Sequence, residues 1–283
     1  MSGAQKRNVC LFICAYLFFI LLMDYPYLAR IRNDYVSAKV MQDYTQNALT
    51  SDTDSVLERA RLYNAALSSG QVSLKDAFDS KGQSTDEVYN TLLSVDETGV
   101  MGSIEIPKID LSLPIYHGVS DDTLLKGVGH LPGSSLPIGG ESTHTVLSAH
   151  RGLPEKTLFT NLDLLDEGDI IYLHVLRETL AYRVYYCEEV LPTDVEHLSI
   201  QGNADLLTLV TCTPYGINTH RLYVHALRVP YEEAKAEKTE GFDFLVYAKL
   251  HWWEWATVLL IIACIITVRI YLRPAKNKRH KAQ

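Results

Sequence analysis

A cysteine and an arginine lie on either side of a predicted turn in the text TLVTCTPYGINTHRLYVHALR, residues 208–228. The apolar, β-branched run that ends at Cys212 carries no helix cap, which predicts a buried strand. Residues 213–219 are rich in turn formers, and residues 220–229 alternate bulky and polar side chains as a second strand. A connection of this length favours an antiparallel hairpin, which would place Cys212 beside Arg221.

This juxtaposition predicts a nucleophile. A fixed cation lowers the pKa of a neighbouring thiol, and the thiolate is the reactive form of cysteine. The alternative is that Cys212 is a small packing residue at the end of a core strand.

A proton-transfer partner for Cys212 is available at His150. This histidine ends the predicted strand HTVLSA and begins the loop-forming run HRGLP, so it occupies a strand end, where functional groups on a rigid sheet usually lie. An exposed loop histidine without a role is the alternative. The remaining histidines of the predicted external domain lack a comparable context, and His220, although it adjoins Arg221, is interpreted as structural.

The texts TLVTCTPYGINTHRL and LSAHRGLP together resemble the catalytic motifs of the sortases, in particular the pilin-polymerising class C. The resemblance implies that Cys212, His150 and Arg221 are catalytic and that Thr211 and Asn218 contact substrate. It implies cleavage of an LPxTG-like sorting signal through a thioester on Cys212. A lysine of another pilin subunit, the acceptor in this class, would then resolve the thioester. No cofactor is implied, and no metal-ligand spacing is visible.

A second match to class C lies before the predicted barrel. The family's lid places an Asp-Pro-aromatic motif in the cleft, and the corresponding text here is Asp76-Ala77-Phe78. By this resemblance Asp76 would meet Arg221 and Phe78 would cover Cys212. Alanine in place of proline removes a fixed φ and predicts a lid that opens more easily. Taken alone, an aspartate and a phenylalanine in a polar loop indicate a helix cap and a local packing anchor.

The chain is predicted to be mainly β with helices. Residues 33–69 show helical spacing of apolar side chains, and a short helix is expected near 86–93. Seven or eight short strands follow from residue 103 to residue 229, separated by Gly, Pro and polar turns, which indicates a closed barrel or a sandwich. The resemblance to sortases implies their eight-stranded β-barrel, preceded by a helical and lid region and flanked by membrane segments.

Two apolar segments flank the predicted external domain. Residues 9–23 are free of charge and are predicted to be a retained anchor, with a cleaved signal peptide as the alternative. Residues 252–272 begin with three tryptophans and lead into a basic tail, which predicts a transmembrane helix with that tail in the cytoplasm. The catalytic domain would therefore lie outside the cell.

Charge and cysteine usage agree with this topology. The formal net charge is −8, and the basic residues of the two tails leave the middle of the chain strongly acidic, which argues against nucleic-acid binding. Only Cys187 and Cys212 of the five cysteines lie outside the apolar segments, and both are predicted to be free thiols.

The predicted N-terminal segments are a cytoplasmic tail (1–8), an anchor or signal (9–23) and a helical and lid region (24–99). The catalytic barrel (100–230), a linker (231–251), a transmembrane helix (252–272) and a basic tail (273–283) follow. The expected partners are the membrane and pilin subunits. The alternative functions are a housekeeping sortase that uses a cell-wall precursor, a membrane-tethered cysteine peptidase, and a non-enzymatic adhesin.

Overall fold

The computed structural model describes residues 3–70, 74, 76–78, 87–237 and 244–272. It divides into two compact units, one formed by residues 30–242 and the other by residues 1–29 together with 243–283. Much of the predicted lid region, part of the linker and the basic tail at 273–283 lie outside the described residues.

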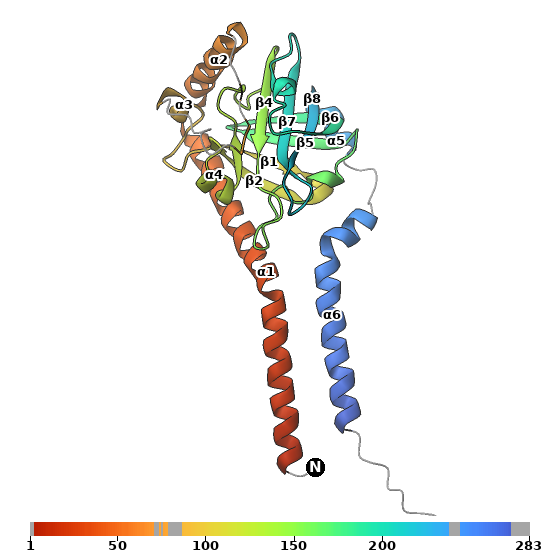
Figure 1. The fold of residues 1–283 in the computed structure, drawn as a ribbon. Helices are drawn as coiled ribbons and strands as arrows, with labels where there is room; N and C mark the ends of the chain where they lie inside the picture. Colours follow the sequence, from red (N-terminus) through yellow and green to blue (C-terminus); the bar gives the residue numbers. More distant parts are fainter. Residues whose placement is uncertain (1–2, 71–73, 75, 79–86, 238–243, 273–283) are drawn as a thin grey trace, which may run out of the picture. The chain divides into compact units, whose positions relative to one another are not determined.

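The larger unit is built on a closed eight-stranded barrel, in the order β1-β2-β3-β4-β7-β8-β6-β5 (Figure 1), and the predicted fold class is confirmed. The strands are β1 (Val100–Ile106), β2 (Leu111–His117), β3 (Val128–His130), β4 (Thr143–Ser148), β5 (Ile170–Val175), β6 (Glu178–Val190), β7 (Asp205–Thr213) and β8 (His220–Val229). The pairs β2–β3 and β4–β7 are parallel, and the other neighbours are antiparallel.

Alternate residues of the strands divide between two apolar clusters. Leu207 and Leu209 of β7 belong to a large cluster with residues from all eight strands, which fills the barrel interior. Val210 of β7 and Tyr223 of β8 belong to a smaller cluster on the outer face. Because successive side chains of a strand point to opposite faces, Cys212 shares the outer face with Val210, and Arg221 shares it with Tyr223.

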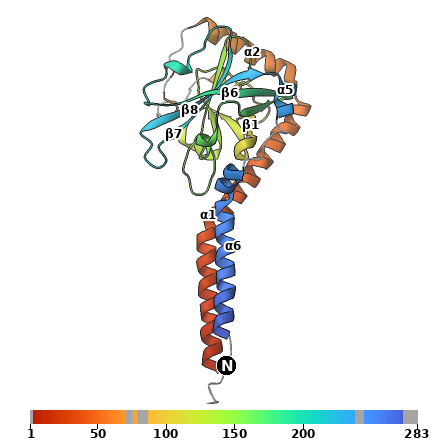
Figure 2. The same cartoon turned by 90° about the vertical axis from the view of Figure 1, so that its right-hand side faces the viewer.

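Helices surround the barrel (Figures 1 and 2). They are α1 (Gly3–Thr50), α2 (Thr53–Ser69), α3 (Glu87–Thr91), α4 (Asp121–Lys126) and α5 (Tyr231–Glu237), with 3₁₀ turns η1 (Pro107–Ile109), η2 (Leu162–Leu164) and η3 (Glu196–Leu198). Tyr44 of α1 donates a hydrogen bond to the carbonyl of Met101 in β1 (2.8 Å), and α2 contributes Val56 and Ala60 to the interior cluster.

The first helix spans several of the predicted segments. The charge-free stretch 9–23 and the expected helical region from residue 33 belong to one continuous helix, α1, with Pro26 inside it. The charged residues between the two stretches do not interrupt it, because Arg, Asp and Asn are tolerated in a helix. The segment that was predicted as an anchor therefore continues directly into a helix that packs on the barrel.

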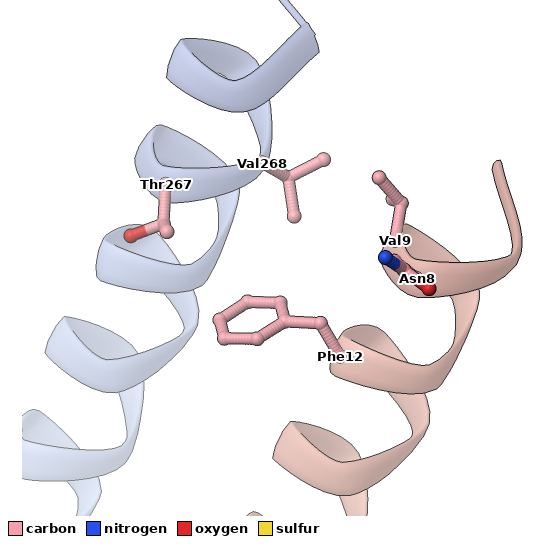
Figure 3. Close-up of a pocket in the computed structure, with 5 residues that line it drawn as sticks. All are labelled: Asn8, Val9, Phe12, Thr267 and Val268. Carbon is pink, nitrogen blue, oxygen red and sulfur yellow. The ribbon is translucent and has the colours of Figure 1, made fainter. Parts of the chain in front are cut away.

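The smaller unit pairs the first part of α1 with α6 (Phe244–Leu272), and both helices are long and apolar enough to cross a membrane. Tyr16 donates to the carbonyl of Leu260 (2.7 Å), and Thr257 donates to the carboxylate of Asp24 (2.8 Å). A cavity of about 350 Å³ lies between the helices, and Figure 3 shows its lining residues: Asn8, Val9, Phe12, Thr267 and Val268.

Candidate active site

Strands β7 and β8 bring Cys212 and Arg221 together, as the hairpin prediction required. The two residues are direct partners in the antiparallel register. The turn between the strands contains Gly216 and Asn218, both with positive φ (75° and 63°), and the amide of Asn218 donates to the carbonyl of Pro214 (3.0 Å). The residues that marked the turn in the sequence therefore adopt the backbone geometry typical of their types.

His150 reaches the same place from strand β4. This strand runs parallel to β7, with Ser148 opposite Val210, so continuing the register by two residues places His150 beside Cys212. Ala149 fixes that continuation, because its amide donates to the carbonyl of Val210 (3.3 Å) and its carbonyl accepts from the hydroxyl of Thr211 (2.8 Å).

The carboxylate of Asp76 is paired with the guanidinium of Arg221. Nε of Arg221 donates to Asp76 (2.9 Å), and a second nitrogen donates to the other oxygen of the same carboxylate (2.5 Å). The remaining nitrogen lies near the carbonyls of His220 (3.2 Å) and Asn218 (3.4 Å). All three nitrogens are therefore engaged, and a bidentate pair of this kind is among the stronger polar contacts in proteins.

Phe78 covers two of the three predicted catalytic side chains. Its ring centroid lies 5.0 Å from the guanidinium carbon of Arg221 and 5.8 Å from the centroid of the His150 ring. Ala77, between the aspartate and the phenylalanine, is almost fully buried in the outer-face cluster beside Val210 and Tyr223. The segment 76–78 is thus seated on the barrel by an ion pair, a ring and a buried methyl group.

The pKa of the Cys212 thiol reflects opposing effects. Burial raises this pKa, Arg221 lowers it as predicted from the sequence, and Asp76 raises it. The pKa is raised overall, because desolvation and Asp76 both oppose the arginine. Burial also lowers the pKa of His150, against a raising effect of Asp121. With segment 76–78 in place, Cys212 is a thiol and His150 is a neutral imidazole near pH 7.

The two predicted substrate contacts occupy different environments. Thr211 is completely buried, and its hydroxyl is used in the bond to Ala149. Asn218 lies in the exposed turn, where its carbonyl faces Arg221. Cys187, in contrast to Cys212, faces the carbonyl of Leu165 (3.8 Å), and both cysteines are free thiols.

Two charged residues near His150 were not singled out from the sequence. Asp121, at the start of α4, acts electrostatically on His150. Arg151 follows His150 directly and is a second buried arginine at the site. The sequence does show an arginine directly after His150. A buried arginine needs a polar partner, but a loop sequence does not reveal that the arginine is buried, so Arg151 was not recognised. Among the described residues, no group of His, Cys, Asp and Glu is arranged to hold a metal ion.

Comparison with known proteins gives consistent results. Residues 104–229 match the model of the sortase domain. The chain is 35% identical over 133 residues to sortase D of Bacillus subtilis and 30% identical over 149 residues to sortase A of Streptococcus agalactiae, covering 47% and 52% of this chain. The aligned regions span 64% and 60% of the lengths of these curated relatives.

Solved structures match over a larger share of the chain. A sortase C of Streptococcus pneumoniae is 44% identical with a TM-score of 0.61, and the match covers 68% of this chain and 97% of that one. Sortase C-1 of Actinomyces oris is 42% identical with a TM-score of 0.59, covering 62% and 99%. A pilus-related sortase C of group B Streptococcus is 40% identical with a TM-score of 0.62, covering 68% and 98%. From its barrel, its site and these matches, the chain belongs to the sortase family.

Proposed function

We propose that the protein is a membrane-anchored cysteine transpeptidase that joins pilin subunits. The observation that carries the proposal is the direct pairing of Cys212 with Arg221, with His150 beside them and Asp76 on the arginine. The likeness to structures of a pilus-related sortase C and of a sortase C described for pilin substrate specificity supports the pilin substrate class.

The reaction begins when a sorting signal displaces segment 76–78. Loss of Asp76 removes one of the groups that raise the thiol pKa and frees the nitrogens of Arg221. The proton of Cys212 passes to His150 as Sγ attacks the threonine carbonyl of an LPxTG-like peptide, and Arg221 donates hydrogen bonds to the developing oxyanion.

Collapse of the tetrahedral intermediate breaks the Thr–Gly amide. His150 gives its proton to the departing glycine amine, which leaves a thioester on Cys212 and a neutral imidazole. A lysine amine then attacks the thioester and passes its proton to His150 as the new amide forms. Cys212 recovers that proton, so the cycle consumes no cofactor.

The membrane arrangement follows from the two terminal helices. Both are long and apolar enough to cross a membrane, and the basic residues after α6 favour a cytoplasmic position for that end by the positive-inside rule. The barrel then faces outward, where its substrates are displayed. Because α1 is continuous from Gly3 to Thr50, we include the N-terminal segment as a retained anchor.

The test uses the full chain in detergent, incubated with an LPxTG-type peptide and followed by intact mass, with and without a lysine-bearing pilin fragment. An acyl adduct on Cys212 that the lysine resolves into a ligated product supports the proposal. Resolution only by a cell-wall amine would indicate the housekeeping reaction, and resolution only by water would indicate a peptidase. No adduct in either the wild-type chain or the Asp76→Ala variant would contradict the proposal.

A further inference from the structure

Arg151, the residue after His150, is buried without being fully satisfied. Only 8% of its side chain is exposed, and one guanidinium nitrogen pairs with the carboxylate of Asp163 in η2 at 2.8 Å. Its Nε is buried and donates no hydrogen bond within the described part of the chain. The carboxylate side chain of Asp163 is 39% exposed and one donor of Arg151 is unsatisfied, so the pair adds little to stability. Its value therefore lies in the geometry that it imposes.

The guanidinium of Arg151 also contacts the other half of the active site. Its carbon lies 5.9 Å from the ring centroid of Tyr215, which belongs to the β7–β8 turn three residues after Cys212. Tyr215 is otherwise 59% exposed, so its ring is held mainly by what lies beneath it. An arginine and an aromatic face attract one another electrostatically as well as by packing.

Gly152 provides the remaining surface under this ring. A Cβ at this position would lie 3.2 Å from the tyrosine ring, and the residue has a φ of +85°, a conformation that favours glycine. The ring of Tyr215 therefore rests directly on the backbone next to His150. This close approach needs a glycine on both grounds.

The loop under Tyr215 is closed on itself by two further hydrogen bonds. The amide of Phe159 donates to the carbonyl of His150 (3.1 Å), and the amide of Gly152 donates to the hydroxyl of Thr160 (3.2 Å). With the Arg151–Asp163 pair, these contacts fix residues 150–152 from one side, while Tyr215 contacts them from the other.

We propose that Arg151 is a positioning residue that clamps Tyr215 and Asp163 together and so holds His150 in place beside Cys212. The clamp joins the loop that follows β4, which carries His150, to the turn that follows β7, the strand that carries Cys212. This inference rests on the proposed function, since positioning has a purpose only if His150 transfers protons during acyl transfer.

The test compares variants of the full chain in detergent. Arg151→Met and Tyr215→Ala each break the clamp, and Tyr215→Phe keeps the ring. Arg151→Lys keeps the positive charge but loses the planar guanidinium, which pairs with Asp163 and contacts the ring of Tyr215. Arg183→Met is the matched control, because it removes an arginine–carboxylate pair, here to Glu233 (3.0 Å). Arg183 of β6 lies opposite Leu227 of β8, and Leu227 is roughly 20 Å along that strand from Arg221 at ~3.3 Å per residue.

The expected loss is in kcat for thioester formation. Arg151→Met and Tyr215→Ala should lower it about 10- to 100-fold with KM nearly unchanged, since small misplacements of a catalytic group have effects of this size. Arg151→Lys should fall between wild type and Arg151→Met, whereas Tyr215→Phe and Arg183→Met should match wild type. The Arg151→Met/Tyr215→Ala double variant should be no slower than the slower single variant, because both remove one contact.

A second readout does not depend on activity. In ¹³C-labelled protein, the ring signal of His150 should titrate with a pKa closer to the ordinary histidine value in Arg151→Met and Tyr215→Ala, because a displaced ring is less buried. Wild-type kcat and an unchanged His150 titration in Tyr215→Ala, which alters an exposed loop residue, would overturn the inference, as would additive losses in the double variant. If wild type itself forms no adduct, the proposed function fails, while the titration still reports on the clamp.

Discussion

Two arginines of the candidate site, Arg221 and Arg151, have largely buried side chains, and they are held in different ways. Arg221 is engaged through two nitrogens by Asp76, which is 145 residues away in sequence and belongs to a short segment outside the barrel. Arg151 is engaged through one nitrogen by Asp163, a member of its own loop. A partner from a separate segment can leave without unfolding the barrel, whereas a partner within one closed loop cannot leave independently.

The difference indicates two separate tasks. The Asp76–Arg221 contact occupies donors that a substrate would need, so it must be exchanged during each reaction. The Arg151–Asp163 contact uses neither Cys212 nor Arg221, and in the proposed clamp it holds His150 in place, so we expect it to persist. We therefore expect matched substitutions in the two pairs to change the reactivity of Cys212 and the rate of acyl transfer to different extents. For the two aspartates, we expect the effects to be opposite in sign.

The largest effect is expected when the exchangeable arginine is removed. Arg221→Met should lower the rate of acyl-enzyme formation by about 10²–10³-fold, as is typical when an oxyanion donor is lost. The measurement is single-turnover formation of the Cys212 adduct at saturating peptide. Because Arg151→Met should lose less, a larger loss in Arg151→Met than in Arg221→Met would reverse the assignment of the two arginines.

The next effect concerns pH. Burial raises the pKa of the Cys212 thiol and lowers the pKa of His150, so both are neutral near pH 7 while segment 76–78 is in place. The rate of Cys212 alkylation in the wild-type chain should therefore rise by close to tenfold per pH unit from about pH 7 towards the thiol pKa, since only thiolate reacts. A rate independent of pH between about 5 and 8 would instead indicate a standing thiolate–imidazolium pair.

Substitution of the two aspartates should have opposite effects, with a faster reaction in Asp76→Ala and a slower one in Asp163→Ala. Asp76→Ala removes a group that raises the thiol pKa and uncovers Arg221, so alkylation of Cys212 near pH 7 should become faster, because a larger fraction of the thiol is ionised. Asp163→Ala should not accelerate alkylation, and it should slow acyl transfer instead. Equal acceleration in both variants would mean that neither pair is specifically exchangeable.

The smallest effect is expected on stability. Gly152→Ala should lower the free energy of unfolding by about 1–3 kcal/mol through backbone strain, and the crowding of Tyr215 should add to this loss. Gly168→Ala is the matched control, since φ at that position is +99° and an added Cβ would meet no atom of the described residues within 4 Å. Denaturant unfolding should show a greater loss of unfolding free energy for Gly152→Ala than for Gly168→Ala. Equal losses would mean that the contact between Gly152 and the ring of Tyr215 does not contribute to stability.

The elements that carry Cys212 and Arg221 could be predicted from the sequence because their pattern is local. An apolar run, a turn and an alternating run specify a hairpin, and a hairpin specifies which residues are opposite. Strand β3 gives no such signal, because it has only three residues, Val128–His130, with a glycine in the middle, and is too short to show a period.

The environment of the site could not be obtained in the same way. The raised pKa of Cys212 depends on burial and on Asp76, and both arise from tertiary structure. The contact of Tyr215 with Arg151 joins two loops whose separation in sequence exceeds 60 residues, so no local pattern reports it. The distant residues that the prediction did include were His150, from its place at a strand end and its motif, and Asp76 and Phe78, from the resemblance of segment 76–78 to a family motif.

The most direct test of the difference between the two arginines is a crystal structure of the chain with a substrate-like peptide linked to Cys212 through a thioester or disulfide. We predict that Asp76 will have left Arg221, with peptide oxygens in its place, and that Arg151 will still pair with Asp163 under the ring of Tyr215. An adduct in which Asp76 remains on Arg221 while the Arg151–Asp163 pair is broken would contradict the account.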